Sequence, residues 1–382
     1  MNIKDFSWKC IRKGLWLTSK VIPVKKDKIV ISSYYGRGYS DNARAIVDQL
    51  LKENCNYDIV WLLKDMSLAK TLPQGVRGVK LESIAGIYEQ ASARLWIDNC
   101  RKWGYVRKKP NQLYLQTWHG SLALKRIEAD AGDALEPGYI TSAQRDSKMT
   151  NLYLSNGNFF TDLVRRAFWY DGPILTCGSP RNDIIINGNS EVYDKVKKHF
   201  NLDTDTKICL YAPTFRKDFS LKAYDMDYMA LKNSLEQRFG GKWVVMVRLH
   251  PNIFQKSKDL QLGDGQSVIN GSYYDDMQDL LVTADMLITD YSSSMFDYFM
   301  CRKPVFIYAS DIEDYAADRG FYFELDKLPF GLAQNNDEMQ ALVKNFDQDA
   351  YINTLNAWAD TMGLIENGTA SAAVCQWINE NM

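Results

Sequence analysis

The sequence predicts an α/β protein made of two doubly wound domains, in which helices cover both faces of a parallel sheet. Short, nearly continuous apolar runs alternate with helical stretches, an order typical of buried parallel strands joined by helices. The 382 residues leave room for two domains, since a typical domain has roughly 150 residues. Hydrophobic residues make up 46% of the chain, enough for a core in each domain. We expect the two domains to face each other across a cleft.

The composition excludes a disordered chain and a nucleic-acid binder that relies on overall charge. The 46 basic and 47 acidic residues nearly cancel, whereas a disordered chain combines low hydrophobicity with high net charge and a charge-driven binder is strongly basic. No apolar stretch reaches the roughly 18 residues that a membrane-spanning helix needs. The seven cysteines form no CxxC pair and fit neither a disulfide framework nor a zinc site, so we expect a reducing compartment. No ligand cluster argues for a metal, and no cofactor is expected.

Residues 1–27 form a separate segment in which basic residues outnumber acidic ones. Phe6, Cys10, Leu17 and Val21 recur in it at roughly helical spacing. The pattern predicts a short basic amphipathic helix that lies on an anionic membrane surface. The alternative is a helix docked on the protein's own surface.

The first doubly wound domain is predicted over residues 28–190. A strand ends in a glycine-containing loop at 28–36, and a helix follows over 41–53. Five further buried strands are expected, each read from a short apolar run: YDIVWLL (57–63), RLWIDNC (94–100), QLYLQTW (112–118), NLYLSNG (151–157) and PILTCGSP (173–180).

The second doubly wound domain is predicted over residues 205–382, after a boundary between Gly188 and Thr206. Its strands are expected at KICLYAPT (207–214), WVVMVRLHP (243–251), MLITDYS (286–292) and PVFIYA (304–309). Helical patterns cover 225–240, 274–284 and 293–300, and the stretch 336–380 is mainly helical. In such sheets ligands bind beyond the carboxyl ends of the strands, so motifs there are candidates for chemistry.

The motif TWHGSLALKR (117–126) follows one of these strands and places His119 at its end. Gly120 lets the backbone approach a ligand closely. Ser121 can cap a helix that begins there, and such a helix start can hold an anion. Lys125 adds positive charge.

Basic residues follow three more strands. Arg181 in CGSPRND (177–183) and Arg216 in YAPTFRKD (211–218) could bind phosphate oxygens. RLHP (248–251) pairs Arg248 with His250, a fixed cation beside a titratable group, which suits an oxyanion that develops during group transfer.

ITDYSSSMFDYF (288–299) completes the set of strand-end motifs. A strand delivers Asp290, and Ser292 and Ser293 begin a helix whose N–H groups and hydroxyls could hold a phosphate. Asp297 lies one turn further and could accept a hydrogen bond from a ligand hydroxyl. The alternative is ordinary helix capping.

Two other patterns are rejected as sites. Asp225-Met226-Asp227 resembles a D-x-D metal motif but lies at the start of a helical stretch rather than at a strand end. His199 lies among lysines on a predicted helix surface and is interpreted as solvated. No P-loop occurs, and no GxGxxG fingerprint follows a strand.

Taken together and in this order, the motifs resemble those of the CDP-glycerol glycerophosphotransferase family, the teichoic acid glycerol or ribitol phosphate primases and polymerases. The resemblance covers about residues 90–375 and rests on these motifs: WHGSLALK, GSPRND, YAPTFR, RLHP, ITDYSSSMFDY, KPVFIY with RGFYF, and the closing GLIENGTASAAV (363–374).

The resemblance implies a GT-B-like fold and a peripheral enzyme on the cytoplasmic face of the plasma membrane. It implies transfer of glycerol phosphate from CDP-glycerol to an undecaprenyl-diphosphate-linked saccharide, with release of CMP. The family's two catalytic histidines fall on His119 and His250. Its substrate-binding positions fall on Gly120, Ser121, Leu122, Ala123, Arg181, Arg248, Leu249, Ser292, Ser293 and Asp297, with Lys125 and Arg216 added from their charge.

One departure from the family pattern concerns the loop after His119. Many relatives read HGTPLK, whereas HGSLALK is one residue longer, so we expect the donor-facing loop to differ. CDP-ribitol as the donor, or a nucleotide-sugar glycosyltransferase of the same fold, remain alternative enzymes. A non-catalytic module that binds a polymer intermediate is the alternative from another class. The lack of a long extra N-terminal region in this chain favours a primase or single-addition enzyme.

Overall fold

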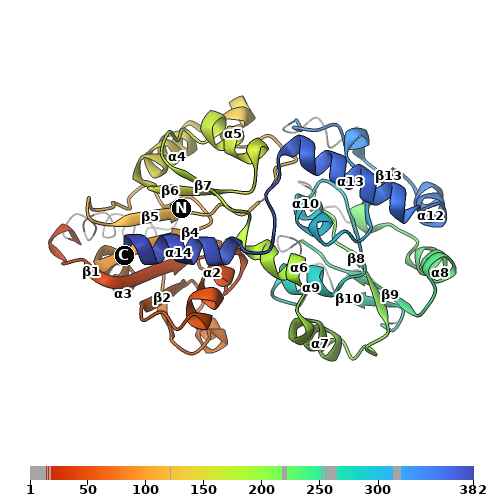
Figure 1. The fold of residues 1–382 in the computed structure, drawn as a ribbon, viewed down its shortest axis with the longest axis horizontal. Helices are drawn as coiled ribbons and strands as arrows, with labels where there is room; N and C mark the ends of the chain where they lie inside the picture. The colour runs from red at the N-terminus through yellow and green to blue at the C-terminus, as the bar shows by residue number, and fades with distance from the viewer. Residues whose placement is uncertain are drawn as a thin grey trace, which may run out of the picture. The chain divides into compact units, whose positions relative to one another are not determined.

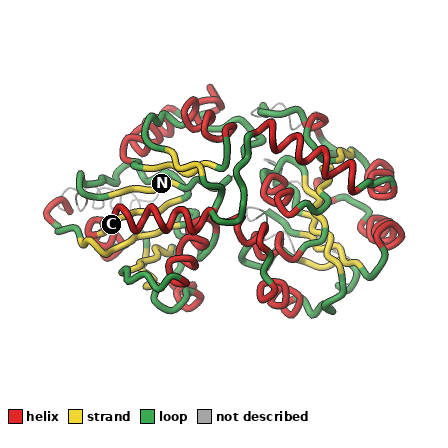
Figure 2. Tube along the Cα trace, in the orientation of Figure 1, coloured by secondary structure: helices red, strands yellow, loops and turns green. Residues whose placement is uncertain are grey.

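The computed structural model describes residues 14, 16, 19–120, 122–216, 222–250, 253, 265–312 and 320–382. The chain divides into two compact units. Unit 1 contains the chain up to His119, Glu128–Asp183 and Ile365–Met382, and unit 2 contains Gly120–Ile127 and Ile184–Leu364 (Figure 1). In each unit the strands lie in the middle and helices flank them (Figure 2).

Unit 1 is built on a seven-stranded sheet with the order β3-β2-β1-β4-β5-β6-β7, and every described pairing is parallel. The strand order reverses between β1 and β4, which in doubly wound sheets is the point where ligands bind. The strands are β1 (Lys25–Ser32), β2 (Asp58–Leu63), β3 (Val76–Lys80), β4 (Ala93–Asp98), β5 (Leu113–Gln116), β6 (Leu152–Ser155) and β7 (Ile174–Thr176). All six strands predicted in this domain are present, and β3 is an additional one.

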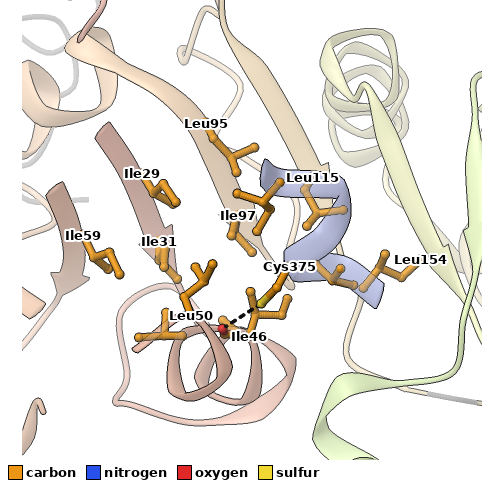
Figure 3. Packing of buried hydrophobic residues seen from close by; sticks show 14 of the residues in the cluster. Ile29, Ile31, Ile46, Leu50, Ile59, Leu95, Ile97, Leu115, Leu154 and Cys375 are labelled. Carbon is orange, nitrogen blue, oxygen red and sulfur yellow. Dashed lines mark hydrogen bonds between the residues drawn. The ribbon is translucent and has the colours of Figure 1, made fainter. Parts of the chain in front are cut away.

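Helices cover both faces of this sheet because successive strand residues point to opposite sides. Ile29 and Ile31 of β1 belong to a cluster with helix residues such as Leu50 (Figure 3), whereas Val30 belongs to a separate cluster. The helical elements are η1 (Ser19–Val21), α2 (Asp41–Lys52), η2 (Met66–Thr71), α3 (Ile84–Ser92), η3 (Glu128–Ala134), α4 (Pro137–Met149), α5 (Asn158–Ala167), η4 (Pro180–Asn182) and α14 (Ala370–Asn381).

The terminal helix α14 belongs to unit 1, although the sequence analysis placed residues 205–382 in the second domain. Cys375 lies at the centre of its contact with α2, and its Sγ is 3.6 Å from the carbonyl oxygen of Ile46 (Figure 3). Val374 and Ile378 are fully buried in the same cluster. The assignment from sequence was wrong because this contact joins residues more than 300 positions apart.

Unit 2 is built on a six-stranded sheet with the order β10-β9-β8-β11-β12-β13, again with parallel pairings. Its strand order reverses between β8 and β11. The strands are β8 (Lys207–Tyr211), β9 (Trp243–Val247), β10 (Val268–Asn270), β11 (Met286–Thr289), β12 (Val305–Tyr308) and β13 (Gly331–Ala333). The four predicted strands form the centre, and the two outer strands were not predicted.

The helices of unit 2 follow the predicted patterns closely. The stretch predicted over 225–240 is α8, that over 274–284 is α9, and that over 293–300 is α10 with η7. The helical elements are α6 (Asp183–Asn187), α7 (Ser190–His199), η5 (Lys222–Tyr224), α8 (Tyr228–Phe239), α9 (Met277–Thr283), α10 (Ser294–Tyr298), η7 (Phe299–Cys301), η8 (Leu325–Lys327), α12 (Asn336–Lys344) and α13 (Gln348–Met362).

The predicted amphipathic segment 1–27 lies mostly outside the described residues. Of its apolar residues, Trp16 is 2% exposed and packs edge-on against Trp96 of β4, with ring centroids 6.1 Å apart. Val21, in contrast, is 87% exposed. Trp16 is therefore part of the unit 1 core, as the alternative of a helix docked on the protein predicts for this residue. Among the described residues, no helix combines the length and apolar character needed to cross a bilayer.

Candidate functional site

His119 lies just beyond the carboxyl end of β5, and its ring is fixed by the neighbouring strand. Its Nδ1 is 2.6 Å from the backbone carbonyl oxygen of Asn99, which follows β4. A carbonyl oxygen can only accept, so Nδ1 carries the hydrogen and Nε2 is left with its lone pair. The backbone thus selects the tautomer in which Nε2 can take up a proton.

Two aromatic rings pack on the imidazole and help to keep it neutral. Trp118 is stacked on it with centroids 4.5 Å apart, and Tyr34 lies at 5.6 Å. Burial lowers the pKa of His119, although the bond to Asn99 and the charge of Asp41 act in the opposite direction. The imidazole is therefore uncharged at neutral pH.

A buried ion pair lies beside the backbone of His119. Arg181 Nη1 donates to Asp41 Oδ2 at 2.8 Å and to the carbonyl oxygen of His119 at 2.8 Å. Asp41 also accepts from the hydroxyl of Tyr34 at 2.7 Å. Burial raises the pKa of Asp41, but the Arg181 guanidinium and the hydrogen bonds outweigh it and leave that pKa below the ordinary value. Arg181, predicted to bind the donor, is only 6% exposed and holds protein groups around His119.

The backbone around His119 is strained. Tyr34, Tyr35, Asp41 and Trp118 have φ values of 44°, 57°, 66° and 54°, in the left-handed region. Each such residue costs roughly 1–2 kcal/mol. Asn99 helps to hold this conformation, since its Oδ1 accepts from the N–H of Tyr34 at 2.8 Å. Strain of this kind concentrates at functional sites, where the surroundings hold it in place.

The helix predicted after His119 is absent, which corrects the expected anion site at its start. The chain enters unit 2 at Gly120 and runs to Ile127 without a helix. Lys125 forms an antiparallel bridge with Phe321, and the N–H of Arg126 donates to the carbonyl oxygen of Gly320 at 3.1 Å. The side chains of Leu122 and Ala123 are both buried. Ser121 lies outside the described residues.

In unit 2, Arg216 joins the ends of three adjacent strands. Its Nη1 donates to Asp290 after β11 at 2.9 Å, and its Nη2 donates to Asp311 after β12 at 2.9 Å. Nε donates to the other oxygen of Asp311 at 2.5 Å. Its guanidinium also lies over the ring of Tyr291, 5.1 Å from the centroid. Each guanidinium nitrogen thus has a protein acceptor. Burial acts to lower the pKa of Arg216, but the bonds to Asp311 and Asp290 outweigh it and raise that pKa above its usual value.

The serine-rich loop starts directly after Asp290. Asp290 is fully buried, and its Oδ1 accepts from the N–H of Thr214 at 2.7 Å and from that of Tyr291 at 2.6 Å. Ser293 is the N-cap residue of α10 but makes no capping hydrogen bond, so ordinary capping does not account for its hydroxyl. A Cβ atom on Gly120 would lie 3.9 Å from Ser293 Oγ, which places Gly120 beside this loop. Asp297 is 4% exposed.

The RLHP motif follows β9, beside β8. Arg248 donates through Nη1 to the carbonyl oxygens of Gly271 and Tyr274, at 3.2 and 2.6 Å, so it supports a neighbouring loop. Leu249 is 1% exposed. The ring of His250 lies against Phe215 with centroids 4.6 Å apart. Within unit 2, His250, Arg216 and the serine-rich loop therefore follow consecutive strands of the sheet.

Residues 16–380 match the family model described as CDP-Glycerol:Poly(glycerophosphate) glycerophosphotransferase. The chain belongs to this family. The resemblance inferred from the sequence motifs is thereby confirmed.

The curated relatives of this chain are named as teichoic acid polymerases and transferases. The chain is 33% identical over 380 residues to a teichoic acid poly(glycerol phosphate) polymerase of Staphylococcus epidermidis, covering 96% of this chain and 52% of the relative. It is 28% identical over 392 residues to a teichoic acid glycerol-phosphate transferase of Staphylococcus aureus, covering 98% and 99%. The chain spans about half the length of the polymerases of S. epidermidis and Bacillus subtilis that it matches.

A solved structure of the wall teichoic acid polymerase TagF has the same fold. The TM-score is 0.82 at 30% identity, and the match covers 100% of this chain and 98% of that one. The predicted α/β class with two parallel sheets is thus confirmed, as is its GT-B-like character.

Sequence reasoning missed several residues that hold His119. Tyr34, Asp41 and Asn99 were not singled out, although Asn99 is a polar residue at the end of a buried strand. The closing motif (363–374) also contacts the CGSPRND motif, since Glu366 accepts from the N–H of Ser179 at 3.1 Å. These contacts connect motifs that are far apart in the sequence, so only the fold reveals them.

The structure shows what the residues of the two rejected patterns contact. Asp227 caps α8 by accepting from the N–H of Ala230 at 2.9 Å, so one acid of the D-x-D pattern has a structural role. His199 is exposed at the end of α7 and packs against the rings of Phe200 and Tyr274. Among the described residues, His, Cys, Asp and Glu side chains nowhere gather as metal ligands would.

Proposed function

We propose that the chain transfers glycerol phosphate from CDP-glycerol to a hydroxyl of a lipid-linked saccharide and releases CMP. The observation that carries this proposal is the neutral His119, whose Nδ1 is bonded to the Asn99 carbonyl and whose Nε2 can accept a proton. Family membership supplies the substrate class. A TagF variant, 29% identical to this chain, has been solved after a soak with CDPG.

Glycerol is favoured over ribitol by the order of similarity among the relatives. The glycerol phosphate polymerase of S. epidermidis is 33% identical to this chain, whereas a ribitol-phosphate primase of Bacillus spizizenii is 26% identical. A ribitol donor therefore remains the second candidate. A glycosyltransferase of the same fold would release UDP or GDP in place of CMP.

The proposed reaction is one in-line displacement at the β-phosphorus of CDP-glycerol. The acceptor hydroxyl oxygen forms a bond to phosphorus, and the bond from phosphorus to the CMP phosphate oxygen breaks. Nε2 of His119 takes the hydroxyl proton, and CMP leaves with the negative charge. Such transfers depend mainly on positioning and electrostatic stabilisation.

The donor diphosphate is proposed to bind in unit 2 at the loop of Ser292 and Ser293. Their hydroxyls and the adjacent N–H groups are suited to phosphate oxygens, and His250 would stabilise the charge that develops on the leaving phosphate. Arg216 is proposed to act indirectly, because its nitrogens already bind Asp290 and Asp311. It would hold the serine-rich loop in place instead of contacting the donor.

The pH dependence of turnover provides a first prediction. Since burial lowers the pKa of His119, the imidazole stays unprotonated at pH values below its ordinary 6.5. We expect the acid limb of kcat/KM, which reports the free enzyme, to have its midpoint below pH 6.5. The measurement is CMP release between pH 4.5 and 8 with donor and acceptor both below their KM, and a midpoint above 6.5 would contradict a buried base.

Membrane association is proposed to depend on the basic residues that precede the core. The deletion should stop before Gly14, because Trp16 packs against Trp96 in the core. We expect removal of residues 1–13 to weaken binding to phosphatidylglycerol vesicles at least tenfold and to leave turnover of a soluble acceptor unchanged. High salt should weaken wild-type binding in the same direction, since it screens surface charges. Undiminished vesicle binding by the shortened chain would refute this role.

CMP release from CDP-glycerol and CDP-ribitol, measured in parallel, tests the proposed function. The acceptors are lipid-linked disaccharides that bear zero or one glycerol phosphate, and the product mass is read from the same reactions. Release from CDP-glycerol alone supports the proposal, and the product length separates a primase from a polymerase. Release from CDP-ribitol alone reassigns the polyol. Donor or polymer binding without any release would identify a binding module instead.

A further inference from the structure

Two exposed aromatic residues of unit 1 form a pair next to the His119 loops. Tyr35 is 39% exposed and Trp103 is 45% exposed, and their ring centroids lie 5.2 Å apart at an angle of 43°. Among the described residues they are the one pair of aromatics in mutual contact that are both this exposed. Exposure of two large rings together leaves apolar surface in water and is typical of a contact site.

The pair is carried by the same loops that hold His119. Tyr35 follows Tyr34, whose ring lies 5.6 Å from that of His119. Trp103 lies four residues after Asn99, whose carbonyl oxygen binds the imidazole. Tyr34 and Tyr35 both have positive φ, and this backbone directs one ring to His119 and the next to Trp103. The strained loop thus positions the pair as well as the base.

Polar groups line a small cavity together with the two rings. The cavity, of about 20 Å³, has Trp16, Asp98 and Lys102 in its wall along with the pair, and a cavity of that size holds about one water molecule. The indole N–H of Trp16 is buried and has no hydrogen-bond partner among the described residues. Asp98 forms an ion pair with Lys102. A ligand on the pair would therefore meet apolar ring faces, and the buried polar groups of this cavity could reach a ligand hydroxyl through one bridging water.

We propose that Tyr35 and Trp103 form a platform for a pyranose ring of the acceptor saccharide. A pyranose has a C–H face that packs on aromatic rings and an edge of hydroxyls that require hydrogen bonds, and the pair with its polar surroundings offers both. The cavity is too small for the sugar, which would lie on the rings. The inference rests on the proposed function and extends it, because it places the acceptor sugar beside the proposed base.

A lipid chain fits these observations less well than a sugar. An acyl or prenyl chain requires a long continuous apolar surface, whereas this pair is limited to two rings and shares its cavity with Asp98 and Lys102. If the rings contact a membrane instead, Trp103→Ala should weaken vesicle binding.

The test compares two acceptors that offer the same glycerol phosphate terminus. One carries it on a lipid-linked disaccharide, and the other on a plain alkyl chain without a sugar. For Trp103→Ala we expect KM for the sugar acceptor to rise about tenfold, while KM for CDP-glycerol, kcat, and KM for the sugar-free acceptor stay within twofold. Trp103→Phe, which keeps an aromatic ring, should recover most of the loss. Tyr88→Ala removes another exposed aromatic of unit 1, which is 43% exposed, and should change none of these values.

A binding measurement separates this inference from the proposed function. Titration of the full chain, without donor, with a soluble N-acetylglucosamine disaccharide should shift the NMR signal of the Trp103 indole in the wild type. Shifts at Trp103 without turnover of any CDP-polyol would overturn the proposed function and retain the platform. Turnover with equal KM changes for both acceptors would overturn the platform, as would a Trp103→Ala variant that loses vesicle binding and keeps its KM for the sugar acceptor.

Discussion

Replacing His119 with Gln is expected to reduce kcat for glycerol phosphate transfer by about 10²–10⁴-fold, the usual contribution of a positioned base. The physical reason is the loss of Nε2 as a proton acceptor at a site where the Asn99 carbonyl fixes the tautomer. The Gln amide nitrogen does not occupy the position of Nδ1, so thermal unfolding must show that the loop stays in place. KM for CDP-glycerol should change little, because the donor is proposed to bind in unit 2. The measurement is steady-state CMP release at saturating acceptor.

Two matched variants make this result specific. His199→Gln makes the same substitution at an exposed position on α7 and should leave kcat unchanged. His250→Gln, at the proposed leaving-group contact, should also lower kcat by orders of magnitude. Near-normal turnover by a folded His119→Gln variant would falsify the assigned base, and thermal unfolding of each variant checks that the fold is retained.

The strands and the strand-end motifs could be predicted from the sequence because they are local. The run QLYLQTW forms β5 (Leu113–Gln116), and His119 follows it as expected. His250 likewise follows β9. β3 (VRGVK) and β13 (GLA) escaped prediction because they contain glycine or alternate with charged residues, so no apolar run marks them. An outer strand can tolerate such a sequence because only one neighbour pairs with it.

The missing helix after His119 shows where local rules fail. Leu122, Ala123 and Leu124 are consecutive and all buried, whereas an amphipathic helix buries residues three or four apart. The segment is held by pairing with residues around Phe321, nearly 200 positions away. The role of Arg181 depended on a similar long-range contact, because Asp41 lies 140 positions before it.

Replacing Arg181 with Met is expected to lower the free energy of unfolding by about 3–5 kcal/mol, the usual cost of leaving a buried charge unpaired. Asp41 is 7% exposed and would lose its guanidinium partner. For a unit of this size the loss corresponds to a fall in the melting temperature of roughly 10 °C. Arg181→Lys keeps the charge but lacks the planar fork, so its loss should be smaller. Thermal unfolding at pH 7.5 measures both variants.

The pH dependence and a double variant test this explanation. In the wild type the pKa of Asp41 is below its ordinary 3.8, so the carboxylate stabilises the fold above that pH and the benefit is lost as pH falls through the lowered pKa. Without Arg181, burial raises the pKa of Asp41, so this carboxyl group takes up a proton more readily. The difference in unfolding free energy between the wild type and Arg181→Met should therefore become smaller as the pH falls towards 5. Combining it with Asp41→Asn removes both buried charges and should recover part of the loss, as a double-mutant cycle would show. If Arg181 instead bound the donor phosphate, Arg181→Met would keep its melting temperature and raise KM for CDP-glycerol.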